Sequence, residues 1–299
     1  MKILLTGITG FLGRHLAKRL IKNGHRVYAI IRKPGVKNKL KLDRIGCFVD
    51  TGSDEKLLKF FQEHRFNGVI HLASRFIIEH KMEDIRDLVN SNILFAARIL
   101  ESSVKSHVSW FINTGTCWQH YQNKKYSPVN LYAASKQAFE VIAQYYIETF
   151  DINFVTLKLN DTYGPQDTRP KIFNIWNNIS NTDELLLMSP GEQLIDLTYI
   201  DDVVDAYIMT VALLKKDTSR LFRGKEFAVL SGNPLPLKEL AKVFSKITGK
   251  KLNIKWGGKS YRKREVMVPW NKAEKVPGWK PKVALEEGIF RTFNGDNEK

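Results

Sequence analysis

Cysteine is scarce in this sequence: among 299 residues only Cys47 and Cys117 occur, which is too few for a disulfide framework or a metal cluster. Long apolar runs are also lacking, because no stretch approaches the roughly 20 residues that a membrane-spanning helix needs. The first residues, Met1 to Leu5, lead directly into a glycine-rich segment and show no signal-peptide cleavage pattern. We therefore expect a cytoplasmic protein with neither membrane insertion nor a bound metal.

Acidic residues are outnumbered, with 31 against 47 lysines and arginines, so the formal net charge at pH 7 is +16. Such a balance suits nucleic acid, an anionic membrane surface or a phosphorylated small molecule. The densest basic runs, at 33–44 and 259–264, lie in no recognisable nucleic-acid module, and aromatic residues are not interleaved as base stacking would require. We expect no nucleic-acid partner, and we expect positions 32–33 and 262–264 to face phosphate.

Apolar runs alternate with helical patterns through the first half of the chain. Strands are expected at 2–6, 26–31, 47–49, 68–72, 109–114 and 153–159, and helices at 11–23, 54–63, 85–102 and 130–150. Alternation of this kind implies a doubly wound α/β fold with a parallel sheet, the Rossmann type. Ligands of such folds bind at the carboxyl ends of the strands.

The regular alternation breaks after Tyr163-Gly164-Pro165. Residues 166–196 mix polar, proline and aromatic residues in a way typical of a substrate lobe, and residues 197–232 look like a return to the main domain. We therefore expect a dinucleotide-binding Rossmann domain formed by 1–165 and 197–232. A smaller C-terminal α/β substrate lobe would then be formed by 166–196 and 233–299.

Two segments indicate the chemistry. Gly7, Gly10 and Gly13 stand where the first strand turns into the first helix, so backbone amides and the helix N-terminus can approach a pyrophosphate. Glycines alone also fit a tight turn without a ligand. Tyr132 and Lys136 lie one helical turn apart on a shared face, which places a cation beside a phenol. We expect the ammonium to lower the phenol pKa by about one or two units from its usual value near 10.

Several motifs occur in a specific order. They are the glycine turn, His71-Leu72-Ala73-Ser74, Asn92, Tyr132-x-x-x-Lys136, Tyr163-Gly164-Pro165, Asp201-Asp202-Val203-Val204 and Gly278-Trp279-Lys280-Pro281. In this order they resemble the extended short-chain dehydrogenase/reductases of the NAD-dependent epimerase/dehydratase family, which act on nucleotide-activated sugars. The resemblance implies that Tyr132 is the general acid/base and that Lys136 holds the nicotinamide ribose. It implies that Thr114 binds the reacting oxygen, with Thr116 as the competing choice.

The same resemblance assigns binding residues around this centre. Those for the cofactor are Gly7, Thr9, Gly10, Phe11, Leu12, Gly13, Arg14, Arg32, Lys33, Asp50, Leu72, Ala73, Ser74, Asn92, Tyr132 and Lys136. Those for the nucleotide sugar are Thr116, Cys117, Asn160, Lys171, Arg262 and Arg264. The resemblance also suggests a homodimer packed through the helices at 85–102 and 130–150.

Two auxiliary groups of related enzymes are missing. Sugar 4,6-dehydratases of this family carry an Asp-Glu pair immediately after the catalytic threonine, where this chain has Gly115 and Thr116. Fucose-synthase-like enzymes place a cysteine at the Thr116 position, whereas Cys117 comes one residue later and should point to the opposite side of an extended strand. Dehydration and ring epimerisation are therefore disfavoured, and simple hydride transfer at a sugar carbonyl remains.

The second strand ends in Ile30-Ile31-Arg32-Lys33, where an acidic residue would bind the adenosine ribose of NAD. An arginine there accommodates a 2′-phosphate, and Arg14 is placed to assist, although a solvent-facing basic loop also explains these residues. We expect NADP as the cofactor, with NAD as the alternative. A net reductase draws on NADPH, whereas a 4-epimerase recycles a tightly held NAD.

The segment 191–204 and Arg262-x-x-Glu265 look most like the CDP-abequose and CDP-paratose synthases, except that Ile195 stands where an arginine contacts the nucleotide diphosphate. The sequence thus predicts NADPH-dependent reduction of the 4-keto group of a nucleotide-linked 6-deoxy or 3,6-dideoxy sugar, for surface polysaccharides such as O-antigen. The alternatives are an NAD-dependent nucleotide-sugar 4-epimerase and a non-catalytic, cofactor-sensing binding protein.

Overall fold

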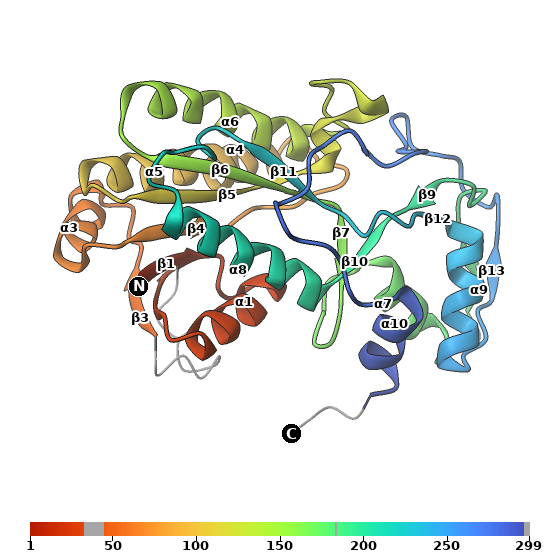
Figure 1. The fold of residues 1–299 in the computed structure, drawn as a ribbon. Coiled ribbons are helices and arrows are strands. Elements are labelled where there is room, and N and C mark those ends of the chain that lie inside the picture. Colours follow the sequence, from red (N-terminus) through yellow and green to blue (C-terminus); the bar gives the residue numbers. More distant parts are fainter. Residues whose placement is uncertain (33–44, 183, 296–299) are drawn as a thin grey trace.

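A seven-stranded parallel sheet forms the centre of this computed structural model, which describes residues 1–32, 45–182 and 184–295 (Figure 1). Its order is β11-β6-β5-β4-β1-β2-β3. The strands are β1 (Lys2–Thr6), β2 (Arg26–Ile31), β3 (Gly46–Val49), β4 (Gly68–His71), β5 (Trp110–Thr116), β6 (Asn153–Leu159) and β11 (Glu226–Val229). The strand order reverses between β1 and β4, and in a doubly wound sheet that switch point opens the crevice in which a dinucleotide binds.

Helices cover both faces of the sheet (Figure 1). Helices α1 (Phe11–Lys22) and α8 (Ile200–Lys216) pack together on one face, and α3 (Asp54–His64), α5 (Phe95–Lys105) and α6 (Leu131–Thr149) pack on the other. The middle strands are buried on both sides, which is why they read as continuous apolar runs. The predicted doubly wound Rossmann fold is confirmed. None of the helices in the described part of the chain is long and apolar enough to cross a membrane.

Two local features differ from the sequence prediction. The helix expected at 85–102 is divided into α4 (Asp84–Val89), a π-helical turn η1 (Asn90–Leu94) and α5. A π-turn of this kind often marks a functional position, and here it carries the buried Asn92. Strand β5 continues to Thr116, two residues beyond the predicted end at Thr114. The extra residues carry the chain further along the carboxyl edge of the sheet.

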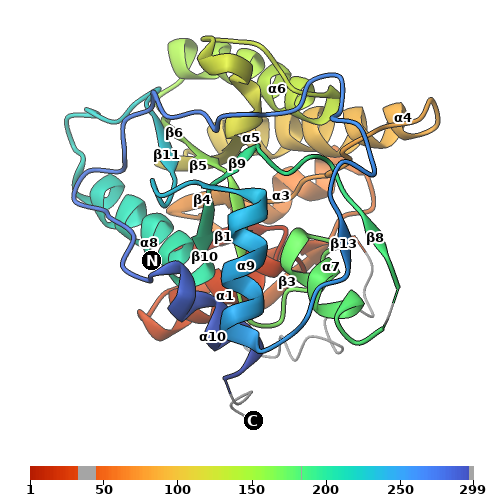
Figure 2. The same ribbon diagram turned by 90° about the vertical axis from the view of Figure 1, so that its right-hand side faces the viewer.

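Apart from α8 and β11, the elements after residue 160 form a second cluster beside the carboxyl edge of the sheet (Figure 2). It contains α7 (Ile172–Ile179), α9 (Leu237–Thr248) and α10 (Leu285–Phe293). Three short strand pairs join it: β7 (Asp161–Tyr163) with β10 (Leu197–Tyr199), β9 (Leu194–Ile195) with β12 (Leu235–Pro236), and β8 (Leu186–Leu187) with β13 (Ile254–Lys255). Two of these pairs connect the segments 166–196 and 233–299, which the sequence analysis assigned to one lobe.

Candidate active site

The glycine turn lines a cavity of about 660 Å³ at the carboxyl edge of β1, β4 and β5. Gly7 has a left-handed backbone with φ +73°, and a Cβ there would lie 2.7 Å from the amide nitrogen of Ala73. A Cβ on Gly13 would overlap the carbonyl oxygen of Gly7. Both positions therefore require glycine, and the turn leaves the amino end of α1 open to the cavity. A diphosphate fits such a cradle, because backbone amides and the helix dipole both favour an anion.

Most of the predicted cofactor residues lie around this cavity. Its lining includes Gly7, Gly10, Phe11, Leu12, Gly13, Leu72, Ser74 and Tyr132. Thr9 and Ala73 lie beside the lining, and Ala73 donates its amide hydrogen to Thr6 Oγ1 at 3.2 Å, which ties the ends of β4 and β1 together. The crevice is thus fixed by backbone contacts from two neighbouring strands.

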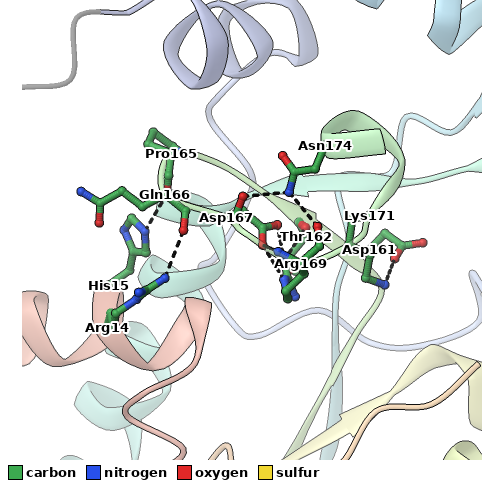
Figure 3. A network of polar contacts seen from close by, with 10 residues as sticks. All are labelled: Arg14, His15, Asp161, Thr162, Pro165, Gln166, Asp167, Arg169, Lys171 and Asn174. Atoms are coloured by element: carbon green, nitrogen blue, oxygen red, sulfur yellow. Dashed lines mark hydrogen bonds and ion pairs between the residues drawn. The ribbon is translucent and has the colours of Figure 1, made fainter. Parts of the chain in front are cut away.

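Of the residues predicted to discriminate between NAD and NADP, some are free to bind a cofactor and others are engaged with the protein. Arg32 is exposed directly after β2, at the carboxyl edge, whereas Lys33 lies outside the described residues. Asp50 is held by Arg98, with Nη1 3.1 Å from Oδ2, and its Oδ1 accepts the amide of Gly52. Arg14 donates from Nη2 to the carbonyl of Gln166 at 3.0 Å, so its side chain points toward the loop after β7 (Figure 3). Arg32 is the described basic side chain left free for a 2′-phosphate at the end of β2.

Helix α6 positions the tyrosine and the lysine. Asn130 caps its first turn by accepting the amide of Ala133 at 3.0 Å, so Tyr132 lies in that turn and Lys136 one turn later. The Lys136 side chain is only 1% exposed. Burial lowers the pKa of this ammonium to about 8, and the nearby carboxylate of Glu140 acts in the opposite direction. Lys136 is therefore still mostly protonated at pH 7.

The Tyr132 phenol shares the cavity with Ser74 and Thr116, and the hydroxyls of both residues lower its pKa. Ser74 is held in turn by Asn92, whose Oδ1 accepts the Ser74 hydroxyl at 3.0 Å while its Nδ2 donates to Ser135. This explains the buried amide in the π-turn: it orients a hydroxyl that faces the tyrosine. The ring of Phe76 packs edge-on against Tyr132, with centroids 4.9 Å apart.

The predicted lowering of the tyrosine pKa is not what the structure gives. Burial raises the pKa of Tyr132 to about 12, and the two hydroxyl contacts offset only part of that rise. Lys136 is not among the principal influences on it. The expectation from i,i+4 spacing was wrong because it ignored the desolvation of a phenol at the bottom of a cavity. At pH 7 the phenol retains its proton, which is the state needed by a proton donor.

Both threonines of β5 line the first cavity, as predicted, but their hydroxyls have different neighbours. The Thr114 hydroxyl forms a hydrogen bond of 2.7 Å with the hydroxyl of Tyr207, a fully buried residue of α8. Thr116, two residues further along the strand, faces Tyr132 instead. The prediction favoured Thr114 because Trp118 follows it by four positions, but the longer strand brings the second hydroxyl to the site. The competing choice, Thr116, fits the geometry better.

Taking Thr116 as the reference moves the dehydratase positions to Cys117 and Trp118. Trp118 cannot act as an acid or base, and Cys117 is buried with its Sγ 3.7 Å from the carbonyl oxygen of Lys158, away from the phenol. Burial also raises the pKa of that thiol far above neutral. Cys117 was predicted to bind substrate, but it is not in the lining of either cavity described here. The pair of acidic residues that dehydratases carry is therefore missing whether Thr114 or Thr116 is taken as the catalytic threonine.

A second cavity, of about 360 Å³, adjoins the first. Asp161, Trp118 and Lys171 line both. Lys171 Nζ lies 2.7 Å from Asp161 Oδ1, and the two side chains face each other in Figure 3. Burial would raise the pKa of Asp161, but Lys171 first, and then Arg169 and Arg262, hold it below its usual value. An ionised carboxylate and an ammonium thus stand where the two cavities meet.

Some of the predicted substrate residues line these two cavities, and others are held by contacts elsewhere. Asn160 lines the first cavity, and Arg262 lines the second, where Glu265 binds its guanidinium through Nε at 2.9 Å and Nη2 at 2.6 Å. Arg264 instead donates to Ser127 Oγ at 2.7 Å and is not in either lining. Of the two arginines proposed to replace the missing one at Ile195, only Arg262 is placed to do so.

Sequence reasoning missed Arg169. Its Nε and Nη2 each lie 2.7 Å from a carboxylate oxygen of Asp167, and Nη2 also donates to the carbonyl of Thr162 (Figure 3). The guanidinium carbon lies 4.5 Å from the ring centroid of Phe11, the first residue of α1, and the side chain lines the first cavity. Asp167 already balances the charge of this guanidinium and fixes its position, and an arginine held in this way at a cavity wall can also bind phosphate oxygens. The only sequence signal was a basic residue shortly after Tyr163-Gly164-Pro165.

Comparison with known proteins agrees with this geometry. The sequence pattern of the NAD dependent epimerase/dehydratase family matches residues 3–222. The chain is 27% identical to the CDP-abequose synthase of Salmonella typhimurium, over 96% of this chain and 95% of that protein. It is also 27% identical to the UDP-glucuronate 4-epimerase of Thermodesulfobacterium geofontis, over 99% of this chain and 96% of that protein.

The fold is similar to a solved UDP-glucuronic acid 4-epimerase from Bacillus cereus, with a TM-score of 0.85, 24% identity and coverage of 99% of this chain and 98% of that one. The family match covers most of the chain, from residue 3 to residue 222. The chain therefore belongs to the NAD dependent epimerase/dehydratase family and is an NAD(P)-dependent enzyme that modifies nucleotide sugars.

Proposed function

We propose that this enzyme uses NADPH to reduce the 4-keto group of a nucleotide-linked 6-deoxy or 3,6-dideoxy sugar. The bound nicotinamide supplies the hydride to the carbonyl carbon. Tyr132 donates its phenolic proton to the carbonyl oxygen, and Thr116 donates a hydrogen bond to the same oxygen. Lys136 holds the ribose of the cofactor and provides positive charge beneath the site as the phenol loses its proton.

The observation that carries this proposal is the position of Arg32. It stands at the carboxyl end of β2, where a ribose-binding acid would favour NAD, and a guanidinium there favours a 2′-phosphate. A cofactor with that phosphate is kept reduced in cells as a hydride donor for net reductions. The protonated state of Tyr132 at neutral pH suits the same direction, since reduction of a carbonyl begins with a proton donor.

The substrate side supports a diphosphate-linked sugar. Arg262 is fixed by Glu265 within the second cavity, and Lys171 stands where that cavity meets the first. Fixed guanidinium and ammonium groups are the usual ligands of phosphate oxygens. Similarity to CDP-abequose synthase favours a CDP-linked substrate for surface polysaccharides.

The direct test follows absorbance of NADPH and NADH with CDP-, GDP-, dTDP- and UDP-linked 4-keto sugars. We expect one member of the panel to be reduced with NADPH. Replacing Arg32 by serine should raise the KM for NADPH by about 10- to 100-fold and leave the KM for NADH little changed, because one charge-assisted contact is lost. Arg26→Ser is the matched control, since Arg26 is exposed at the opposite end of the same strand. Equal effects of the two variants would contradict the assignment.

A second candidate is an NAD-dependent 4-epimerase, because the similarity to UDP-glucuronate 4-epimerase is as close as that to CDP-abequose synthase. The reaction itself separates them. Interconversion of two sugar epimers by enzyme carrying tightly bound NAD, without oxidation of added NADPH, would establish the epimerase.

We also propose that the enzyme is a homodimer. Large apolar side chains are exposed on α6 and on the neighbouring α4–η1 segment, among them Val141, Tyr145, Val89 and Leu94. Such a patch is typical of a protein interface. Sedimentation velocity should give twice the monomer mass, and Val141→Glu should yield monomers. Leu185→Glu changes an exposed leucine beside β8, in the second cluster of elements, and should remain dimeric; a monomeric wild type would refute the proposal.

A further inference from the structure

A second group of charged side chains lies buried beneath the catalytic residues. Lys158 of β6 is 1% exposed, and its Nζ lies 3.3 Å from Glu140 Oε2, 2.8 Å from Glu226 Oε2 and 2.8 Å from His120 Nε2. Glu140 is buried, whereas Glu226 reaches the surface. These four residues come from α6, β6, β11 and the turn after β5. None of them lines either cavity, so none is placed to touch substrate or cofactor.

Glu140 connects this group to the catalytic residues through Gln119 and through its position one helical turn from Lys136. It follows Lys136 by four residues on α6, so the two side chains share a face of the helix. Its Oε2 accepts a hydrogen bond of 2.9 Å from Gln119 Nε2, while Gln119 Oε1 accepts the amide hydrogen of Thr116 at 2.9 Å. A Cβ on Gly115 would lie 2.8 Å from Glu140 Oε1, so glycine at that position leaves room for the carboxylate.

We propose that Glu140 is a positioning residue: its carboxylate is the counter-ion that keeps the buried Lys136 ammonium charged, and through Gln119 it fixes the strand end that carries Thr116. The inference rests on the proposed roles of Lys136 and Thr116. It concerns how their charge and orientation are maintained, and so goes beyond the reaction itself.

The electrostatic balance around the pair favours this role. Burial opposes the charged form of Lys136, and Glu140 is the principal carboxylate acting against that effect. Burial, together with the nearby Glu226, raises the pKa of Glu140 above its usual value, and Lys158 first, then Gln119 and Lys136, oppose that rise. On the other sides, His71 of β4 is kept neutral, because burial and Lys136 both lower its pKa.

His120 has a lowered pKa for a similar reason, since burial and Lys158 both oppose its charged form. Glu226 forms an ion pair with Lys158 and is not among the principal influences on the pKa of Lys136. Glu140 is therefore the near negative charge for an otherwise unfavourable ammonium. A buried charge whose counter-ion is removed either loses its own charge or destabilises the fold.

The experiment is an NMR titration of the cofactor-free enzyme carrying ¹³C-labelled lysine, with the Lys136 signal assigned by its loss in Lys136→Met. In the wild type this signal should titrate near pH 8, well apart from the exposed lysines. In Glu140→Gln it should titrate about one to two pH units lower, as expected when a charge one helical turn away is removed at an effective dielectric near 20. An unchanged titration would overturn the proposal.

Glu226→Gln is the matched control, because it removes a carboxylate from the same Lys158 but not from the neighbourhood of Lys136. Its Lys136 titration should match the wild type. If Glu140→Gln does not fold, the double variant Glu140→Gln/Lys158→Met removes both partners of the buried pair and avoids an unpaired charge. It should still titrate below the wild type, and an unchanged value there would overturn the proposal equally.

A kinetic measurement links the counter-ion to catalysis. The alkaline limb of kcat/KM against pH should move to lower pH in Glu140→Gln by the same interval as the NMR titration, and Glu140→Asp should restore most of the difference. A loss of activity that is equal at every pH would show a merely structural role and overturn the proposal. If the Lys136 titration shifts in Glu140→Gln but the wild-type enzyme reduces no keto sugar, the proposed role of Glu140 as counter-ion stands and only the proposed function is refuted.

Discussion

Tyr132→Phe is expected to lower kcat for carbonyl reduction by about 10²- to 10⁴-fold, the usual contribution of a positioned general acid. The substitution removes one oxygen and keeps the ring, so the edge-on contact with Phe76 is retained. Loss of the hydroxyl also relieves the burial of a polar group, and the free energy of unfolding should change little. Steady-state kcat, with NADPH binding followed by fluorescence, separates the lost proton from any loss of cofactor affinity.

The control for this variant is Tyr28→Phe. Tyr28 lies on β2, where its ring packs against Phe66, and it lines neither cavity, so removal of its hydroxyl should leave kcat unchanged. Turnover of Tyr132→Phe within a few-fold of the wild type would refute the assigned acid. A large loss of NADPH affinity at unchanged kcat would instead place Tyr132 in cofactor binding only.

Local sequence signals were sufficient for the fold. Each strand of the central sheet is a short apolar run, and each crossover helix has an apolar face, so parallel pairing with helices on both sides follows from patterns within about 20 residues. The glycine turn was equally clear in the sequence, and the structure explains its glycines. A Cβ on Gly7 would collide with Ala73, and a Cβ on Gly13 would collide with the carbonyl oxygen of Gly7. Strand β11 was not predicted, although residues 227–230 form an apolar run of the same kind.

The candidate site was predicted less completely, because its contacts join distant segments. The partner of Thr114 is Tyr207, 93 residues later, and nothing near Thr114 in sequence indicates it. Arg169 reaches the start of α1 through a turn held by Asp167, which depends on the fold of the loop after β7. The pKa of Tyr132 depends on burial, which spacing alone does not report. Residue types were therefore easier to predict than their partners.

The second large effect concerns the two threonines of β5. Thr116→Val should lower kcat by about 10²- to 10³-fold, the range found when one hydrogen-bond donor to a developing oxyanion is removed. Valine keeps the shape of the side chain but also loses the acceptor for the amide of Trp118, 3.3 Å away. Thr116→Ser retains the hydroxyl and should recover most of the activity, which distinguishes the lost donor from a disturbed turn.

Thr114→Val tests the alternative assignment in the same strand. It leaves the buried hydroxyl of Tyr207 without its partner, which should reduce the free energy of unfolding by about 1–3 kcal/mol while kcat falls only a few-fold. We therefore expect opposite patterns for the two variants. Steady-state kinetics should show the larger catalytic loss in Thr116→Val, and chemical denaturation should show the larger loss of stability in Thr114→Val. The reverse pattern would assign the reacting hydroxyl to Thr114. Because that hydroxyl is bound to Tyr207 in this structure, α8 would then have to move when substrate binds.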